Sequence, residues 1–157
     1  MRARRLTRSP EDRRVYVLRG VGTLRLTGWG SRAATAEGGG LSWQLAHRGI
    51  WQPVFQAADA AGDIVGDFRG RMLQHGGVLR WSDRELDLRP DGFGRERYAL
   101  VEEGRALATI ERTGGWGRRP VDIAISEPDA IDPGLVLFAV FVVATLTQST
   151  QAAAAAA

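Results

Sequence analysis

The strongest constraint on the fold is an uninterrupted apolar run near the end of the chain, from Leu135 to Leu146. The run has no polar stripe, so a helix built from it would be apolar on every side and must be surrounded by protein or lipid. Asp132 can cap the first free N–H groups of such a helix, and Pro133 suits its first position. The sequence therefore predicts a hydrophobic core helix over residues 133–150.

Two other interpretations of this run stay open at the level of sequence. A membrane-spanning helix needs about 20 apolar residues, whereas the run has twelve, which extend about 18 Å as a helix. Polar residues follow at 147–151, but the alanines at 152–157 can lengthen the helix, so a C-terminal membrane anchor is an alternative. Several β-branched residues would also suit a buried strand. The cap and the length favour a helix wrapped by a sheet.

Length and composition indicate one globular domain. The chain of 157 residues is long enough to bury a core, and it has no cysteine for disulfides or thiolate metal sites. No apolar segment lies near the N-terminus, which predicts no signal peptide and a cytoplasmic location. Every basic residue is arginine, a bias typical of GC-rich coding, so the net charge of +3 is weak evidence for a nucleic-acid partner. Residues 1–12 are predicted to be a flexible basic tail.

The chain before the apolar run is predicted to form about ten to twelve short strands. The clearest hairpin pairs Arg97–Glu102 with Arg105–Arg112, and residues 120–126 alternate as a last strand. Ser31–Gly40 is small and glycine-rich and is predicted to be a loop. A sandwich has no space for a helix that is apolar all round, whereas a barrel of eleven or twelve strands can enclose a helix about 10 Å across.

The predicted fold is therefore mainly β: a closed or nearly closed antiparallel barrel of about 12 strands around the hydrophobic C-terminal helix. The barrel domain is expected to cover residues 13–150, and residues 151–157 are expected to be an alanine tail.

Three stretches resemble the tubby C-terminal-like superfamily, which includes tubby proteins, phospholipid scramblases and LURP-one-related proteins. They are Asp59–Arg71, Tyr98–Arg112 and Val121–Leu146. The resemblance implies a twelve-stranded barrel around a C-terminal helix. Tubby proteins bind phosphoinositides through a pocket containing lysine and arginine, but this chain has no lysine and the pocket cannot be placed on it. Scramblases add a calcium-binding segment, for which no counterpart is found here.

No catalytic constellation stands out in the sequence. His47 and His75 lack partners at metal-ligand spacing, and no cofactor or metal is expected. An enzyme with a small ligand in the barrel mouth is the third-ranked hypothesis, because a helix inside the barrel leaves such a ligand little room.

Two arginine pairs are the best candidates for binding an anion. Arg69 and Arg71 share one face of a strand, and Arg118 and Arg119 lie beside Trp116 on a glycine-rich turn. Ordinary solvated arginine is the competing interpretation. The expected function is a non-enzymatic binding module that recognises an anionic lipid headgroup or a protein partner, peripherally at the membrane in the lipid case. The alternative is a scramblase-like protein that uses its C-terminal helix as a membrane anchor.

Overall fold

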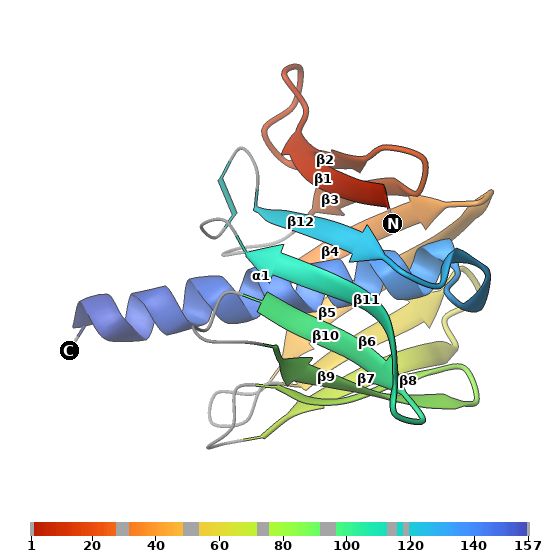
Figure 1. Cartoon of the computed structure of the whole chain (residues 1–157). Helices are drawn as coiled ribbons and strands as arrows, with labels where there is room; N and C mark the ends of the chain where they lie inside the picture. Colours follow the sequence, from red (N-terminus) through yellow and green to blue (C-terminus); the bar gives the residue numbers. More distant parts are fainter. Residues whose placement is uncertain are drawn as a thin grey trace.

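The computed structural model of the chain describes residues 2–27, 32–48, 54–71, 76–91, 97–112, 116–117 and 120–156. Within these residues the chain forms twelve strands, one 3₁₀ helix and one α-helix (Figure 1). In chain order they are β1 (Arg2–Arg8), β2 (Val15–Leu18), β3 (Gly22–Leu26), β4 (Ala33–Gly38), β5 (Leu41–Arg48), β6 (Val54–Asp59), β7 (Ile64–Gly70), β8 (Gly77–Trp81), β9 (Arg84–Pro90), β10 (Arg97–Glu102), β11 (Arg105–Arg112), β12 (Val121–Ile125), η2 (Pro128–Ala130) and α1 (Pro133–Ala156).

The twelve strands form a closed antiparallel barrel in which every strand pairs with its neighbours in sequence. The predicted hairpin is present, with β10 and β11 joined across Glu103 and Gly104. Side chains alternate between the inside and the outside of the barrel, as the period of two requires, with interruptions at register shifts in the β6–β7 and β10–β11 pairs. The predicted fold class, a closed barrel of about 12 strands around a C-terminal helix, is confirmed.

Strand β1 closes the barrel, because it pairs with β2 on one side and with β12 on the other. The prediction of a flexible tail is therefore wrong for Arg2–Arg8. The many arginines made this segment resemble a solvated tail, because its one large apolar side chain is Leu6, which is 0% exposed. Arg4 also lies on the inward side, but near the strand's end, where its guanidinium donates to the Arg19 carbonyl oxygen at 2.9 Å.

Strand β4 replaces most of the predicted loop at Ser31–Gly40, so that prediction is also wrong. Its small residues have a packing role, because Ala34 and Ala36 are fully buried and α1 packs directly against this strand. A strand of alanines lets the backbone of the sheet approach the helix closely. The side chains of β4 are therefore small because the space between this strand and α1 is narrow, and not because the strand faces solvent.

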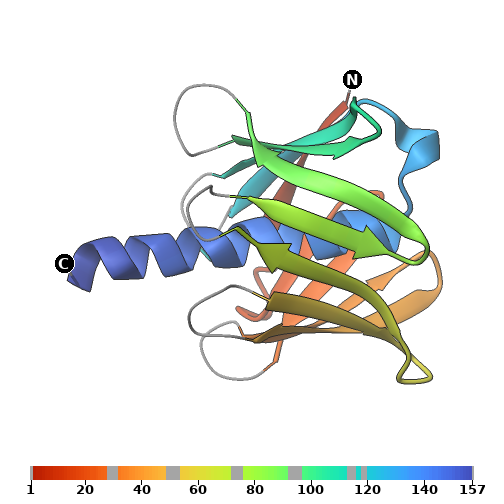
Figure 2. The ribbon, with the colours of Figure 1, turned by 90° about the horizontal axis from the view of Figure 1, so that it is seen from below.

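Helix α1 runs through the barrel and projects beyond one end of it (Figure 2). Every side chain from Leu135 to Ala144 is at most 2% exposed, and Thr145 is 3% exposed. The predicted cap is present, since the Leu135 N–H donates to Asp132 Oδ1 at 3.2 Å. The helix continues to Ala156, past the predicted end at residue 150.

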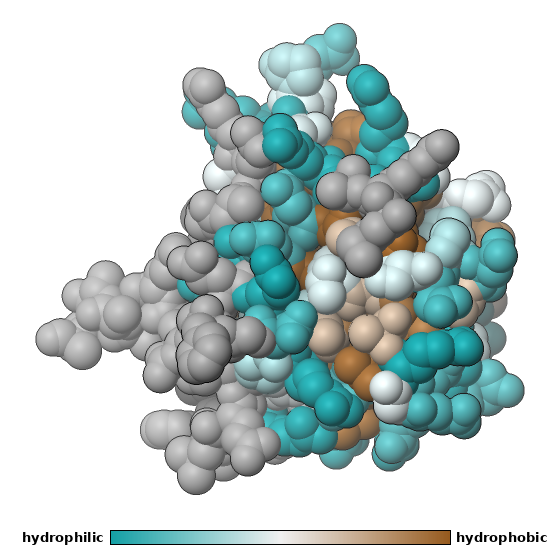
Figure 3. Space-filling model, viewed as in Figure 1, coloured by the Kyte–Doolittle hydropathy of each residue, from teal (hydrophilic) through white to brown (hydrophobic). Residues whose placement is uncertain are grey.

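The two ends of the barrel differ in what they contain. At the end where α1 begins, here called the Asp132 end, lie the tight turns that follow β4, β6, β8 and β10. At the opposite end, here called the Thr145 end, α1 leaves the barrel where the odd-numbered strands end. Figure 3 shows one side of the molecule, with hydrophilic residues around a more apolar centre. The exposed large hydrophobic side chains among the described residues are Val17, Leu41 and Ile64.

Candidate functional site

The arginine pair predicted on β7 does share the outer face of the barrel. Arg69 and Arg71 are exposed, while Phe68 and Gly70 between and beside them are buried. They line a pocket of about 310 Å³ over β7–β9, together with Asp67, Gly70, Val78, Arg80 and Glu85.

Charge in this pocket is largely balanced. Arg71 Nη2 lies 3.1 Å from Asp87 Oδ1, and Arg80 Nε lies 3.4 Å from Glu85 Oε2. Arg89 makes a further ion pair with Asp87 at 3.1 Å. Because carboxylates already face most of these guanidinium groups, the outer face of β7–β9 has little positive charge left for an anion.

Trp116 lies at the Thr145 end and packs against the barrel interior. Its indole N–H donates to Thr145 Oγ1 at 3.3 Å, and its ring centroid is 5.0 Å from that of Tyr16 and 5.9 Å from that of Phe141. The Tyr16 hydroxyl donates to the Trp116 carbonyl oxygen at 3.2 Å, and burial raises the pKa of Tyr16. This indole covers the helix where it leaves the barrel. Arg118 and Arg119, the other predicted residues of this loop, lie outside the described residues.

A cluster of arginines outside the two predicted pairs lies on one arc of the Thr145 end. We call it the basic rim and define it as Arg13, Arg14, Arg32 and Arg48. All four are exposed, and none forms an ion pair with a carboxylate of the described residues. Arg13 and Arg14 lie between β1 and β2, Arg32 directly precedes β4, and Arg48 is the last residue of β5, so all four lie at the same end of the neighbouring strands β2–β5.

Backbone hydrogen bonds hold Arg14 and Arg32 against the barrel. The Leu26 N–H donates to the Arg14 carbonyl oxygen at 2.8 Å, and the His47 N–H donates to the Arg32 carbonyl oxygen at 2.7 Å. Two arginines of the rim therefore start from an ordered backbone.

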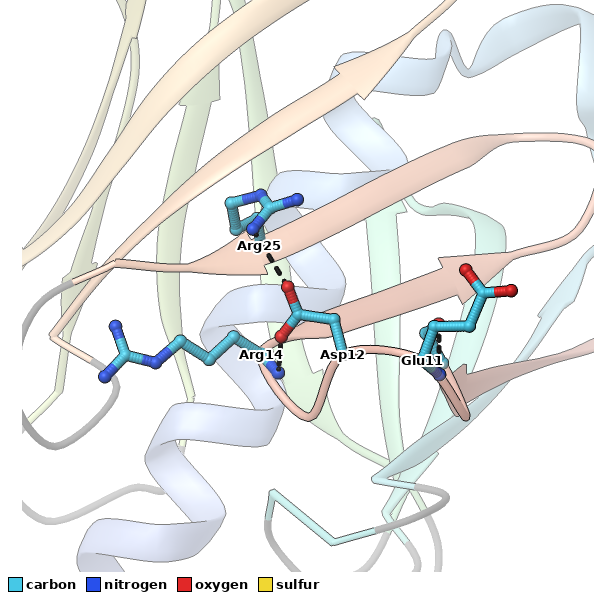
Figure 4. Close-up of polar contacts among 5 residues, drawn as sticks. Glu11, Asp12, Arg14 and Arg25 are labelled. Carbon is cyan, nitrogen blue, oxygen red and sulfur yellow. Dashed lines mark hydrogen bonds and ion pairs between the residues drawn. The ribbon is translucent and has the colours of Figure 1, made fainter.

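The nearest carboxylate, Asp12, is already occupied (Figure 4). Asp12 Oδ1 accepts the Arg14 backbone N–H at 2.9 Å, and Asp12 Oδ2 accepts Arg25 Nη1 at 3.1 Å. The bond from the Arg14 backbone is the largest cause that lowers the pKa of Asp12, with Arg25 adding to it. The Arg14 side chain extends away from this carboxylate in Figure 4, and its guanidinium forms no ion pair with Asp12.

Across the whole arc, six arginines lie with two carboxylates, an excess of four positive charges. The members are Arg8, Arg13, Arg14, Arg25, Arg32 and Arg48, with Glu11 and Asp12.

His47 adds no charge to this arc at neutral pH. Its ring stacks on Phe55 with centroids 4.4 Å apart, and burial, followed by the nearby Arg32, lowers the pKa of its imidazole.

The described part of the chain holds neither a candidate metal cluster nor a candidate membrane-spanning helix. No group of three or more His, Cys, Asp or Glu side chains there is placed to hold a metal ion. No helix in that part is both long and apolar enough to cross a bilayer.

Comparisons with known proteins leave the family of the chain as a prediction. The chain matches no protein-family model, no curated protein and no solved structure. The tubby-like superfamily therefore stands as a resemblance whose predicted architecture this barrel shares.

Proposed function

We propose that this protein is a non-enzymatic binding module that associates peripherally with an anionic lipid surface through the basic rim at the Thr145 end. The observation that carries the proposal is the local excess of positive charge, on exposed guanidinium groups that no described carboxylate pairs. Each basic residue held near an anionic bilayer contributes about 1 kcal/mol of attraction, so four together supply useful affinity.

The position of α1 also bears on this proposal. Its apolar run is enclosed by the barrel, so these side chains cannot contact lipid while the barrel is intact. This burial argues against the scramblase-like alternative, in which the same helix would be the anchor. Side chains of α1 fill the interior of the barrel from Leu135 to Ala144, so a substrate has no space beside this part of the helix.

Vesicle flotation tests the proposal. Binding is measured to vesicles of phosphatidylcholine with roughly a third phosphatidylglycerol and to pure phosphatidylcholine vesicles, at low and physiological salt. We expect binding to the anionic vesicles alone, weakening as salt screens the charges. Changing Arg13, Arg14, Arg32 and Arg48 together to Gln should lower the affinity at least about hundredfold, from about 1 kcal/mol for each charge.

A matched control removes the same charge elsewhere. Arg5, Arg19, Arg80 and Arg105 are all exposed and lie away from the rim, and changing these four to Gln should lower the affinity by much less. Equal losses in the two variants, or no binding to anionic vesicles at all, would reject the rim as a lipid site. An R69Q/R71Q variant tests the outer pocket, and an R118A/R119A variant tests the loop of Trp116.

A further inference from the structure

A separate cavity lies at the Asp132 end of the barrel, opposite the basic rim. Its volume is about 530 Å³, and its wall combines aromatic, aliphatic and acidic side chains. The residues that matter for its chemistry are Trp43, Trp81, Asp59, Asp132, Leu41 and Val65.

Two indoles form the aromatic wall of the cavity and are held in fixed positions. The Trp43 and Trp81 rings lie 6.0 Å apart at an angle of 59°. Trp81 also packs on Phe138 of α1, at 5.7 Å, and its N–H donates to Asp132 Oδ2 at 3.1 Å. A Cβ atom at Gly134 would lie 2.5 Å from Trp81 and 2.6 Å from Trp43, so the start of α1 fits closely against both rings.

Two carboxylates supply negative charge at this cavity, each oriented by the backbone. Asp59 Oδ1 accepts the N–H groups of Ala61 and Asp63, both at 3.0 Å. Asp132 caps α1 through its Oδ1 atom. No arginine of the described residues lines the cavity. Arg84 lies near this end, close enough for its charge to interact with Asp132, and its guanidinium is bound to Glu102 by hydrogen bonds of 2.8 and 2.9 Å.

The mouth of the cavity is apolar. Leu41, the first residue of β5, lines it and is 64% exposed, and Val65 of β7 adds a partly buried aliphatic side chain. Leu41 has the same parity along β5 as the inward-facing Trp43. A register shift in the β6–β7 pair places Ile64 opposite Ala58, on the outer face, so Ile64 does not line the cavity.

We propose that this cavity binds an organic cation: an ammonium or guanidinium group attached to an apolar body. Indole faces attract cations through their quadrupole, and the two carboxylates complement the charge. The aliphatic side chains at the mouth suit the apolar part of the ligand. An anion would be repelled by Asp59 and Asp132, and a neutral apolar ligand would remove water from both carboxylates without compensation. The cavity lies at the opposite end of the barrel from the basic rim and would bind a cation, whereas the rim would bind an anionic surface. The two proposals are therefore tested independently.

Choline and its uncharged carbon isostere, 3,3-dimethylbutan-1-ol, provide the first test. They are titrated into ¹⁵N-labelled protein while the indole N–H resonances are followed by NMR. We expect choline to shift the Trp43 and Trp81 resonances in a saturable manner, and the isostere to bind at least about tenfold more weakly. Equal binding of choline and the isostere overturns the proposal. So does the absence of a saturable shift with both choline and a blocked Leu-Arg-Leu tripeptide.

A charge-neutral variant tests the Asp59 carboxylate without removing its structural role. Asp59 accepts both backbone N–H groups through one oxygen, which asparagine keeps, so D59N should keep the fold, which circular dichroism checks. Its affinity for choline should fall at least about fivefold. The control D83N removes one acidic charge at the same end, outside the cavity, and should change the affinity less than about twofold. Equal losses in the two variants overturn the assignment to the cavity.

A peptide arm distinguishes a free cation from one carried by a partner protein. The probe is a blocked Leu-Arg-Leu tripeptide, with Leu-Gln-Leu as its uncharged match. Tighter binding of the arginine peptide than of choline, reduced by L41S, assigns the site to a protein segment. Tighter binding of choline assigns it to small organic cations. Both results support an organic-cation site, whereas equal affinity for the arginine and glutamine peptides counts against it.

Discussion

At the residue scale, one ion pair joins two adjacent strands at the Asp132 end. Arg84, the first residue of β9, donates from Nε and Nη2 to the two carboxylate oxygens of Glu102, the last residue of β10, at 2.8 and 2.9 Å. The side chains are 28% and 23% exposed, so the pair is partly shielded from water. The hydrogen bonds from Arg84 lower the pKa of Glu102.

This pair predicts a specific pH dependence. Because the pKa of Glu102 is lowered in the folded state, the stabilisation is complete above the ordinary glutamate value of about 4.3 and is lost as pH falls through the lowered pKa. Glu102→Gln should lose up to about 1 kcal/mol at neutral pH and show a shallower loss of stability below about pH 4.3 than the native chain. Urea unfolding across the acid range measures both. Glu85→Gln, at an exposed pair with Arg80, is the control, and parallel curves for native chain and Glu102→Gln would contradict the prediction.

Gly134 yields a second prediction at this scale. Replacing glycine by alanine inside a helix usually stabilises by up to about 1 kcal/mol. Here the added Cβ would overlap both indoles, and overpacking costs about 1–3 kcal/mol. Gly134→Ala should therefore destabilise the protein in chemical denaturation. In a W43F/W81F background, which lacks the overlapping ring atoms, the same change should cost less, and an equal cost would show that the indoles are not the cause.

At the element scale, β1 shows how charge can hide a strand. Its sequence, Arg-Ala-Arg-Arg-Leu-Thr-Arg, contains one large apolar residue. The strand is nevertheless stabilised by pairing on both sides, because it fills the gap between β2 and β12. Without it, both neighbours would become edges with unpaired backbone groups.

Substitutions in β1 separate a structural strand from a tail. Leu6→Ala should cost about 2–5 kcal/mol, as expected for a fully buried leucine. Arg5→Ala, at a side chain that is 62% exposed and 4.0 Å from Asp122, should change stability by less than about 0.5 kcal/mol. Thermal or urea unfolding measures both. Two small and equal effects would mean that β1 contributes little to the barrel.

At the scale of the whole molecule, helix and sheet depend on one another. The barrel needs α1 to fill its interior, and α1 needs the barrel to keep its apolar side chains from water. Full burial of a Leu, Val or Phe side chain contributes about 1.5–3 kcal/mol, and such side chains dominate the run from Leu135 to Val143.

Truncation tests this mutual dependence. A chain that ends after Asp132 should fail to fold, because the barrel would enclose an empty lumen. A chain that ends after Leu146 keeps every fully buried residue of the described helix and should fold with nearly native stability. Near-ultraviolet circular dichroism and thermal unfolding distinguish the two outcomes. A stable fold without α1, or unfolding after the shorter cut, would contradict the account of α1 as the core.

The sequence by itself determined the helix and the kind of sheet that must surround it. An apolar run without a polar stripe, preceded by Asp132 and Pro133, restricts the choice to an enclosed rod, and the alternating segments supply the enclosure. These signals are local, since a cap or a period of two can be detected within a few residues. The hairpin of β10 and β11 was predicted for the same reason.

Only the tertiary structure decided which distant residues meet. Arg14, Arg32 and Arg48 are far apart in sequence, and they share a rim because consecutive strands return to the same end of the barrel. Trp116 covers the helix because β11 ends and β12 begins at the Thr145 end. The cavity at Trp43 and Trp81 likewise depends on three hairpins and the start of α1. Strand register and barrel closure are long-range properties, and local patterns of hydrophobicity and charge do not specify them.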